Sequence, residues 1–592
     1  MNKRPVQKTV VRRLKPYYES NISQRVRFFG LAALVGLLVG SATLVLIEMI
    51  ALVQWFFFGR ASEADFASIV EQSPVWLVVM APAVGGLLVG LLLRFVQGRR
   101  YQGIADVMEA CAVRGARMDG RSGVSAAIAA ALSLGSGAPV GREGPAVHIG
   151  ASISAWIAER LGFSQSDSLT LLGCGAAAAV TASFNAPIAG VLFALEVVVG
   201  YYTMRVFAPV VVASAASVIV RRTFYGSDHV FDLSQFTLSS HWELPLFGAV
   251  GIVCALFVLA LIFVVGRIQD GWGKTRVPNW LQPAIAGLVI GLLGIWIPHA
   301  LGSGYQSIDM ALNGQMLPVF LFSLLLTRMI STALALGSGF AGGVFTPSLV
   351  FGALVGALVW ALLSPLFPAS SQGVYAIVGM GALASAMLGA PISTVLIVFE
   401  LTANYQVTIA VMLAAAMAST VMQLSPNTSY FRWQLGRRGI NITSGRDQSL
   451  LRTQTIENLV KQSFSAIEEA DKIIDVQRRL SADRHRIAIF TDAEGHFVGS
   501  ANLRMLVAES IDHGFDTPAC DVLGPATRCI GVQTNLVAAL QEMAENDMDY
   551  MPVVEDKDEA RSPLRGVVFR DDVLRNYYDV VRAARAEEFG VN

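Results

Sequence analysis

The sequence predicts an all-α polytopic membrane domain, built from a repeat of uneven and broken helices, followed by a soluble α/β pair of small domains. Composition is the first reason: the chain of 592 residues is 54% hydrophobic and only 15% charged, whereas soluble domains carry about 25% charged residues. The second reason is that apolar segments crowd between about residues 28 and 430. The third is that glycine-rich motifs recur at nearly constant spacing within those segments.

The N-terminal segment, residues 1–27, carries eight Lys and Arg side chains against one Glu. The apolar run 28–58 that follows it is too long for the core of a cleaved signal peptide. As a helix this run would be roughly 46 Å long, more than the ~30 Å hydrocarbon core, so we expect a tilted span. Arg432, Arg437 and Arg438 follow the last apolar run. The positive-inside rule then predicts that both termini lie on the cytoplasmic side of the cell (inner) membrane.

The apolar region contains both single spans, such as 244–268, and interrupted ones, where Gly and Pro separate 124–137 from 146–162. Broken helices are tolerated at membrane depth only where their backbone is buried or lines a cavity. After Arg438 the charge rises, and amphipathic helices alternate with β-branched runs such as RIAIF and MPVVE. The predicted parts are a basic N-terminus 1–27, a membrane domain 28–438 with repeat halves of about 28–220 and 244–430, a linker 439–455, soluble domains 456–513 and 518–583, and a tail 584–592.

Two pairs of matching motifs lie in the two halves of the membrane domain. GSGAPVGREGP (135–145) matches GSGFAGGVFTP (337–347), and their starts differ by 337 − 135 = 202 residues. NAPIAGVLFALE (185–196) matches GAPISTVLIVFE (389–400), and their prolines differ by 391 − 187 = 204 residues. The alternative is that small residues recur wherever membrane helices pack. Broken helices at matching positions of two halves indicate a transport site between the repeats.

Each glycine-rich motif ends in a proline that can open a helix, at Gly144-Pro145 and at Thr346-Pro347. A helix N-terminus presents unpaired N–H groups and about half a positive charge. Two converging N-termini would therefore form a weak anion site, as permeation requires. Glu143, a carboxylate beside this site, could occupy it as a tethered competing anion and open it when protonated or displaced. The alternative is a structural carboxylate paired with Arg142.

GREGP (141–145), GGVFTP (342–347), the repeat pattern and the soluble C-terminal pair together resemble the CLC family of chloride channels and proton/chloride exchangers. The resemblance covers nearly the whole chain and implies an inverted repeat and a homodimer with one anion pathway per subunit across the lipid bilayer. It also implies that Glu143 is the external gate and that the hydroxyl of Tyr430 contacts the central anion, chloride or another small anion. The further residues that it places at the anion are Gly141, Arg142, Gly144, Val344 and Phe345.

The family's GSGxP serine, which also contacts the ion, lies roughly forty residues before the gating glutamate. The literal match at Ser136 is only seven residues before Glu143, so we do not assign it that role. The segment YQGIADVMEA (101–110) lies at the family's distance before Glu143. In it, Gln102 takes the position of the family's serine and Ala105 that of its proline. The glutamine amide can donate a hydrogen bond to an anion. Which anion the site prefers, chloride, nitrate or another, stays open. The alternative is that Gln102 points away from the ion.

Family exchangers usually carry an internal, proton-relaying glutamate next to another glutamate. Here that position is Val197, after Glu196, and an aliphatic side chain cannot carry a proton. The sequence therefore favours channel-like, uncoupled conduction. The alternative is a proton-coupled antiporter that uses Glu143 and Glu196, although the matching positions of Glu196 and Glu400 favour a structural role for both.

The C-terminal pair resembles tandem cystathionine-β-synthase (CBS) domains. Copies that bind adenine nucleotides tend to end in a strand, a Ser or Thr and, three residues on, an Asp. Asp572 is retained, but Phe569 replaces the hydroxyl residue, and the first copy has Asn502 and Met505 at these positions. Nucleotide binding is thus doubtful, and no other cofactor is predicted. A third hypothesis is a sensor in which this pair signals and the membrane part only anchors it.

Several other functions are not indicated. GWGKT (271–275) lacks the glycine that a phosphate-binding loop needs at Ile268. The five cysteines show no metal-ligand spacing, and zero net charge gives no reason to expect a nucleic-acid partner. We therefore predict neither a metal site, nor a catalytic site, nor an enzyme.

Overall fold

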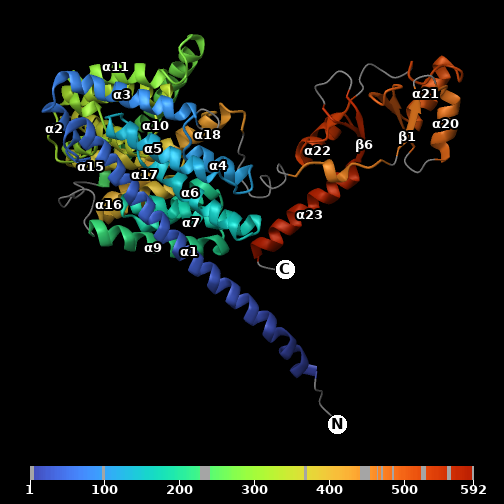
Figure 1. Cartoon of the computed structure of the whole chain (residues 1–592), viewed down its shortest axis with the longest axis horizontal. Helices are drawn as coiled ribbons and strands as arrows, with labels where there is room; N and C mark the ends of the chain where they lie inside the picture. The colour runs from blue at the N-terminus through green and yellow to red at the C-terminus, as the bar shows by residue number, and fades with distance from the viewer. Residues whose placement is uncertain are drawn as a thin grey trace. The chain divides into compact units, whose positions relative to one another are not determined.

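The protein was analysed as a computed structural model, shown in Figure 1. It forms two compact units, Met1–Ile442 and Thr443–Asn592, called below the membrane unit and the C-terminal unit. In its described residues the first unit is built of helices, and the second combines helices with two small sheets. These features confirm the predicted fold class. The described residues are 6–95, 100–226, 241–365, 370–440, 454–462, 464–468, 471–482, 486–521, 528–556 and 562–589.

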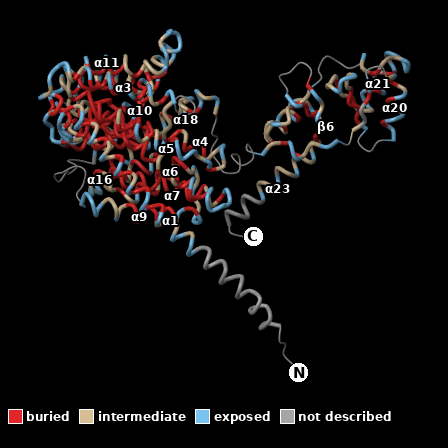
Figure 2. Tube along the Cα trace, in the orientation of Figure 1, coloured by how far each residue is buried: buried red, intermediate tan, exposed pale blue. Residues whose placement is uncertain are grey.

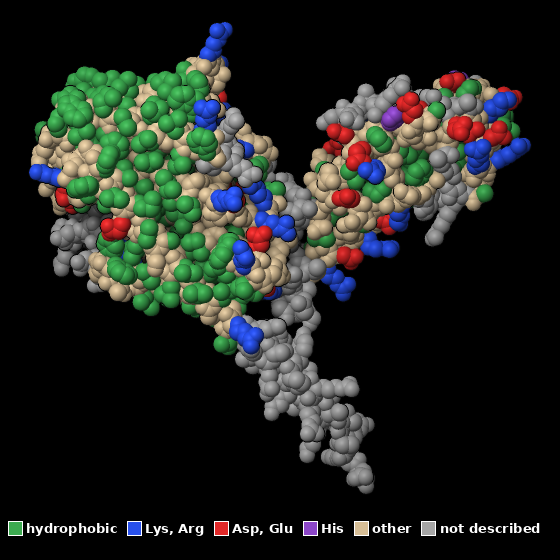
Figure 3. Space-filling view, in the orientation of Figure 1, with side chains coloured by type: hydrophobic (Ala, Val, Ile, Leu, Met, Phe, Trp, Pro, Cys, Tyr) green, Lys and Arg blue, Asp and Glu red, His purple; other side chains and the backbone are tan. Residues whose placement is uncertain are grey.

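Within the described residues, eight helices of the membrane unit are long and apolar enough to cross a bilayer. Their outward faces carry large apolar side chains such as Leu52 and Phe322, and Figure 3 shows such side chains covering the visible face of this unit. That surface suits contact with lipid tails rather than water. The helices are α1 (Val6–Phe58), α3 (Val75–Arg94), α7 (Gln165–Phe184), α9 (Met204–Tyr225), α10 (Leu244–Lys274), α13 (Pro318–Ser338), α14 (Phe345–Leu363) and α17 (Tyr405–Gln423).

Shorter helices fill the interior and the ends of the membrane unit. The predicted break between 124–137 and 146–162 lies between two of them, α5 and α6. Every residue of α15 is buried, so its backbone is enclosed by protein. Figure 2 shows buried residues, in red, gathered in the interior of the membrane unit. These helices are α2 (Phe66–Glu71), α4 (Ile104–Ala112), α5 (Gly120–Gly135), α6 (Glu143–Arg160), α8 (Pro187–Phe193), α11 (Gln282–Trp296), α12 (Tyr305–Leu312), α15 (Gln372–Leu388), α16 (Pro391–Thr402) and α18 (Tyr430–Gly436).

The two halves repeat the same helix packing. In the first, α6 packs on α7 so closely that a methyl group on Gly150 would lie 2.5 Å from the carbonyl oxygen of Gly175. In the second, α14 packs on α15, and a methyl group on Gly352 would lie 2.3 Å from the carbonyl oxygen of Gly379. The offsets, 352 − 150 = 202 and 379 − 175 = 204, equal those of the sequence motifs. Glycine is needed at these contacts because the helix backbones touch.

The C-terminal unit contains two copies of one arrangement. In each copy the first strand pairs parallel to the second, and the second pairs antiparallel to the third. Ile487 and Ile489 of the first copy share an apolar cluster with Tyr550 and Val567 of the second, so the copies pack together. The elements are β1 (Ser465–Glu468), α20 (Ile473–Ala482), β2 (Ile487–Thr491), β3 (Phe497–Asn502) and α21 (Leu503–His513), then β4 (Ile530–Gly531), α22 (Leu536–Glu545), β5 (Tyr550–Val554), β6 (Leu564–Phe569) and α23 (Arg570–Phe589).

Candidate anion site between the two repeats

The two glycine-rich motifs meet through their backbones. The N–H of Gly141 donates to the carbonyl of Gly343 at 2.7 Å, and the N–H of Gly343 donates to the carbonyl of Gly141 at 2.6 Å. Two residues later in each motif a helix begins, α6 at Glu143 and α14 at Phe345. The tertiary structure therefore brings together two helix N-termini that are about 200 residues apart in the chain.

Both prolines lie in the first turn of a helix, as predicted, although neither is its first residue. Pro145 and Pro347 are the third residues of α6 and α14, so each helix opens two residues before its proline. Proline is tolerated there because the N–H groups of a first turn have no acceptor within the helix in any case. The N–H groups that remain, with the positive ends of both helix dipoles, make this junction attractive to an anion.

The Glu143 carboxylate lies at the start of α14. It is fully buried and accepts hydrogen bonds from the hydroxyl of Thr346 and, at 3.3 Å, from the Thr346 N–H. A methyl group on Gly141 would lie 2.6 Å from Glu143 Oε2, so the glycine leaves room for the carboxylate. Glu143 therefore begins one of these helices and places its carboxyl group at the N-terminus of the other.

Arg142 does not form the ion pair with Glu143 that the structural alternative proposed. Within the described part of the chain, its guanidinium pairs with Glu63, contacts the carbonyl of Ser183 at 3.4 Å and lies 5.7 Å from the ring centre of Tyr305. It lines a separate cavity of about 310 Å³ together with Glu63 and Arg221. The hydrogen bonds of its guanidinium thus go to groups other than Glu143, and its predicted contact with the anion stays a prediction.

A cavity of about 850 Å³ opens at this junction. Three predicted anion-binding residues, Gly144, Val344 and Tyr430, are among those that line it. Tyr430 is the first residue of α18, and its ring packs on Trp433 with a centroid distance of 5.4 Å. Arginines line the same cavity, whereas Asp and Glu are missing from its described lining, so the charged side chains on the wall itself are positive. The four arginines are Arg94, Arg100, Arg437 and Arg438.

The remaining predicted residues lie beside this cavity rather than on its described lining. The ring of Phe345 packs on Phe184 and Phe193, at centroid distances of 4.7 and 5.8 Å, which leaves only its N–H for an anion. Gln102 is half-buried, and its neighbours Tyr101 and Gly103 line the cavity instead. A role for Gln102 at the anion stays a prediction.

Ser136, which the sequence analysis set aside, is also outside the described lining of the cavity. It is buried, and its hydroxyl donates to the carbonyl of Ser133 at 3.0 Å. The hydroxyl of Ser133 in turn accepts the N–H of Ala341 at 3.0 Å. Ser133, two residues before the GSGAP segment, therefore makes the hydrogen bond to the second motif, whereas the Ser136 hydroxyl bonds within its own turn.

Glu196 and Glu400 each cap a helix of the opposite repeat. The Glu196 carboxylate accepts the N–H groups of Ile392 and Ser393, at 3.2 and 2.8 Å, at the start of α16. The Glu400 carboxylate accepts those of Ile188 and Ala189, at 3.0 and 2.7 Å, at the start of α8. A carboxylate is favourable at a helix N-terminus, so both have a structural role in this arrangement. Val197 is buried in the π-helical turn Ala194–Val199 that follows α8.

In the C-terminal unit, Asp572 forms an ion pair with Lys461 at 2.6 Å, and both line a cavity of about 200 Å³. The Lys461 ammonium also lies 5.7 Å from the ring centre of Phe569. Asn502 caps α21, because its side-chain oxygen accepts the N–H of Met505 at 2.8 Å. The residues at the predicted nucleotide positions thus already have protein partners, and weak contact of Asp572 with a nucleotide stays a prediction.

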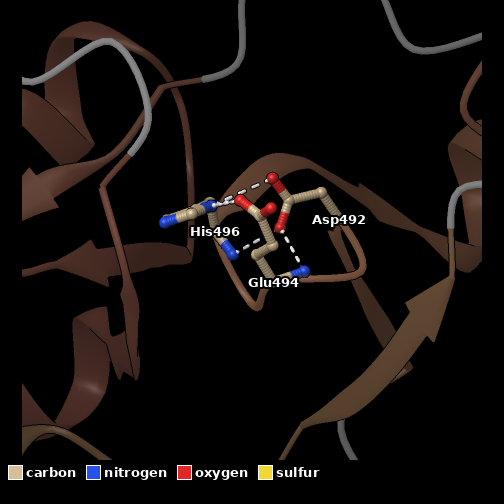
Figure 4. Close-up of side chains that lie close together, drawn as sticks. All are labelled: Asp492, Glu494 and His496. Atoms are coloured by element: carbon tan, nitrogen blue, oxygen red, sulfur yellow. Dashed lines mark hydrogen bonds and ion pairs between the residues drawn. The ribbon is translucent and has the colours of Figure 1, made fainter.

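Asp492, Glu494 and His496 lie close together in the turn between β2 and β3 (Figure 4). Oδ1 of Asp492 accepts the N–H groups of Glu494 and His496 at 3.0 and 2.8 Å, and its Oδ2 lies 3.0 Å from Nδ1 of His496. The hydrogen bond from the His496 N–H is the main reason that the Asp492 pKa lies below its usual value. These bonds explain the cluster as a hairpin turn, and we assign no metal to it.

Sequence reasoning missed three residues around the site. Thr346 lies inside the quoted GGVFTP motif, and a hydroxyl residue in a first helical turn is a usable signal for an anion or carboxylate partner. Tyr101 is adjacent to Gln102 in the segment chosen for anion binding. Glu63 is 79 residues from Arg142 and offers no local signal of their pairing.

Comparison with known proteins agrees with this geometry. The sequence model of the voltage-gated chloride channel family matches residues 85–423, and that of the CBS domain matches 521–579. A protein of Ralstonia nicotianae described as a ClcB-like chloride channel protein is 33% identical over 393 residues, covering 65% of this chain and 91% of the relative.

Two crystal structures share the fold. A slow cyanobacterial Cl⁻/H⁺ antiporter aligns with a TM-score of 0.61 at 22% identity, covering 70% of this chain and 98% of the other. A eukaryotic CLC transporter aligns with a TM-score of 0.60 at 18% identity, covering 93% of this chain and 98% of the other. The chain therefore belongs to the CLC family, the voltage-gated chloride channel family, and carries CBS domains at its C-terminus.

Proposed function

We propose that this chain forms a homodimer in the cell (inner) membrane, with both termini cytoplasmic, and conducts chloride or another small anion through a pathway gated by Glu143 in each subunit. One observation carries the proposal. The Glu143 carboxylate lies between the N-termini of α6 and α14 and accepts hydrogen bonds from Thr346. A negative group held there by an N–H and a hydroxyl marks a site that suits a free anion equally well.

The gating step follows from competition for these donors. While ionised Glu143 accepts the hydrogen bonds of Thr346, an anion at the same position would be repelled and would lack those donors. Protonation or rotation of the Glu143 side chain removes both obstacles. Because the donors are neutral N–H and O–H groups, the anion is bound without a full counter-charge and can leave again. The arginines that line the adjoining cavity add positive charge to its wall, offset in part by the ion pairs of three of them with nearby carboxylates.

Uncoupled, channel-like conduction is the mode that we favour. Val197, at the position of the family's proton-relaying glutamate, is buried and cannot carry a proton. Its neighbour Glu196 already accepts two backbone N–H groups at the start of α16. Protonating Glu196 would weaken those bonds, which makes it a poor relay between the cytoplasm and Glu143.

Proton-coupled exchange is the second candidate, and His148 is the observation in its favour. His148 lies five residues after Glu143 on α6 and is fully buried. Neither ring nitrogen has a hydrogen-bond partner in the part of the chain that the structure describes. Imidazole can accept and release a proton, and here it would do so against the cost of charging a fully buried ring. A relay through His148 would reach Glu143 without using Val197.

The deciding experiment uses purified full-length protein in liposomes with a chloride gradient, and follows chloride and protons together. Chloride efflux without coupled proton movement would support channel-like conduction. Uphill proton movement driven by chloride would establish exchange, and loss of that coupling in His148→Leu, with chloride flux retained, would identify the relay. No anion flux from folded wild-type protein would contradict both candidates and favour the sensor hypothesis.

A further inference from the structure

Tyr101 carries a buried hydroxyl that the gating model does not use. Its oxygen is closed off from solvent, and no described residue offers it a hydrogen-bond partner. Burying a hydroxyl without a partner costs free energy, so such groups in native proteins call for an explanation, often an absent ion or ligand. The residue directly precedes Gln102, in the segment just before α4.

The hydroxyl lies beside the first turn of α6. A methyl group built on Gly144 would lie 3.3 Å from Tyr101 Oη and 3.0 Å from the Cα of Gly343. The ring passes over Gly103, where a methyl group would lie 3.2 Å from Tyr101 Cε1. Glycine at 103 and 144 therefore leaves room for the ring and brings its hydroxyl to the junction of the two repeats.

Tyr101 also lines the cavity of about 850 Å³ that Gly144, Val344 and Tyr430 line. Three of the arginines on its wall form ion pairs, at 3.0 Å from Arg100 to Asp106, 3.0 Å from Arg438 to Asp106 and 2.6 Å from Arg437 to Asp270. Neither Asp106 nor Asp270 is part of the described lining. Arg100 and Arg438 also approach Glu109, at 3.9 and 3.5 Å. Tyr101 thus lies on the wall of a cavity whose described lining carries arginines and no carboxylate, with the partner carboxylates of three arginines set behind that wall.

We propose that the Tyr101 hydroxyl donates a hydrogen bond to the transported anion and supplies the contact that the sequence assigns to Gln102. The proposal rests on the function proposed above and names a further ligand of the same site. Tyr101 and Tyr430 then contribute two phenolic O–H donors, alongside the N–H groups at the starts of α6 and α14. The ligand class is a partly dehydrated monovalent anion of halide size, since each donor is neutral and offers a single proton.

The test is chloride binding to purified full-length protein by isothermal titration calorimetry. We expect Tyr101→Phe, which removes only the hydroxyl, to weaken chloride binding by about tenfold, a change of about 1.4 kcal/mol. Gln102→Ala tests the competing assignment, and we expect it to weaken chloride binding less than Tyr101→Phe does. Tyr405→Phe removes a hydroxyl from an exposed ring on α17 and serves as the matched control, with unchanged affinity. Unchanged affinity in Tyr101→Phe, or a loss in Gln102→Ala alone, would overturn the proposal.

A second measurement needs no variant and covers the case in which Tyr101→Phe fails to fold. Crystals of wild-type protein grown in bromide would locate the anion by its anomalous scattering. We expect a bromide within about 3.5 Å of Tyr101 Oη, a hydrogen-bonding distance for this larger ion. A bromide near Val344 and Tyr430 but beyond reach of Tyr101 would refute the Tyr101 contact and leave the proposed function intact. Wild-type protein that binds no halide would instead count against the proposed function itself.

Discussion

Gly141 and Gly343 exchange two backbone hydrogen bonds, at 2.7 and 2.6 Å, and so join the two repeats directly in front of the helices that carry Glu143 and Phe345. A two-residue antiparallel contact of this kind sets how far apart the two helix N-termini lie. Neither glycine has room for a side chain, because a methyl group on Gly141 would lie 2.6 Å from Glu143 Oε2 and one on Gly343 would lie 2.9 Å from the N atom of Gly144. The anion site therefore depends on backbone geometry as much as on any side chain.

Gly343→Ala tests that dependence. The added methyl group would lie 2.9 Å from the N atom and 3.2 Å from the Cα of Gly144, and this backbone cannot move without separating α6 from α14. We expect chloride affinity to fall by about tenfold, comparable to one lost hydrogen bond to a charged group. Titration calorimetry measures the change. Gly271→Ala, where a methyl group would meet no atom within 4 Å, is the control and should bind chloride normally.

Glu143→Gln tests the gate. The amide mimics the protonated carboxyl and loses the charge that competes with the anion, so we expect anion flux to persist and to lose its steep dependence on pH. Flux from liposomes at a series of pH values is the measurement. Glu159→Gln, an exposed change near the end of α6, should retain the wild-type profile. If the flux of Glu143→Gln depended on pH as the wild-type flux does, Glu143 would not be the gate.

Glu196→Ala and Glu400→Ala test the reciprocal caps. Each change removes the acceptor of two backbone N–H groups, at Ile392 and Ser393 or at Ile188 and Ala189. The cost is about 1–3 kcal/mol for each group left unpaired where it is buried. We expect both Ala variants to show a lower apparent melting temperature in detergent. The Gln variants keep an acceptor oxygen, so their melting temperatures should fall less.

The same pair of sites separates a structural role from proton transfer. If Glu196 relays protons, Glu196→Gln would abolish chloride-driven proton movement while melting like wild type. Glu400→Gln would then retain the proton movement and melt at a lower temperature. We expect instead that neither Gln variant changes proton movement, because each carboxylate caps a helix through two backbone N–H groups. Glu196 also accepts the hydroxyl of Ser393, so Glu196→Gln should melt no higher than Glu400→Gln.

Arg328→Met tests a buried cation in α13. The guanidinium is fully buried and donates to the carbonyls of His299, Gly302 and Ser303 at 2.7, 2.8 and 2.6 Å. Methionine fills much of the volume but leaves three carbonyls without donors, a loss of about 3 kcal/mol or more. We expect a marked fall in the apparent melting temperature.

Arg276→Met, at an exposed position after α10, is the control for loss of an arginine charge. Equal melting temperatures for the two variants would show that the Arg328 contacts contribute little.

The chain's local sequence was sufficient to predict the class of fold and the location of the site. The apolar run 244–268 predicts the span α10 because lipid requires continuous hydrophobic helices. Glycine and proline predict the breaks before α6 and α14 because they act on the backbone at their own positions. The motif offsets of 202 and 204 residues recur in the glycine contacts between packed helices, since a repeated sequence packs in a repeated way.

The partners of individual side chains depended on the tertiary structure. Thr346 reaches Glu143 across 203 residues, and Glu63 rather than Glu143 pairs with Arg142. Tyr101, not its neighbour Gln102, lines the cavity. Such contacts depend on how helices far apart in sequence are rotated and spaced, and a hydrogen bond is gained or lost within about 1 Å. Local spacing determines which groups are available, and only the packing of the two repeats determines which of them meet.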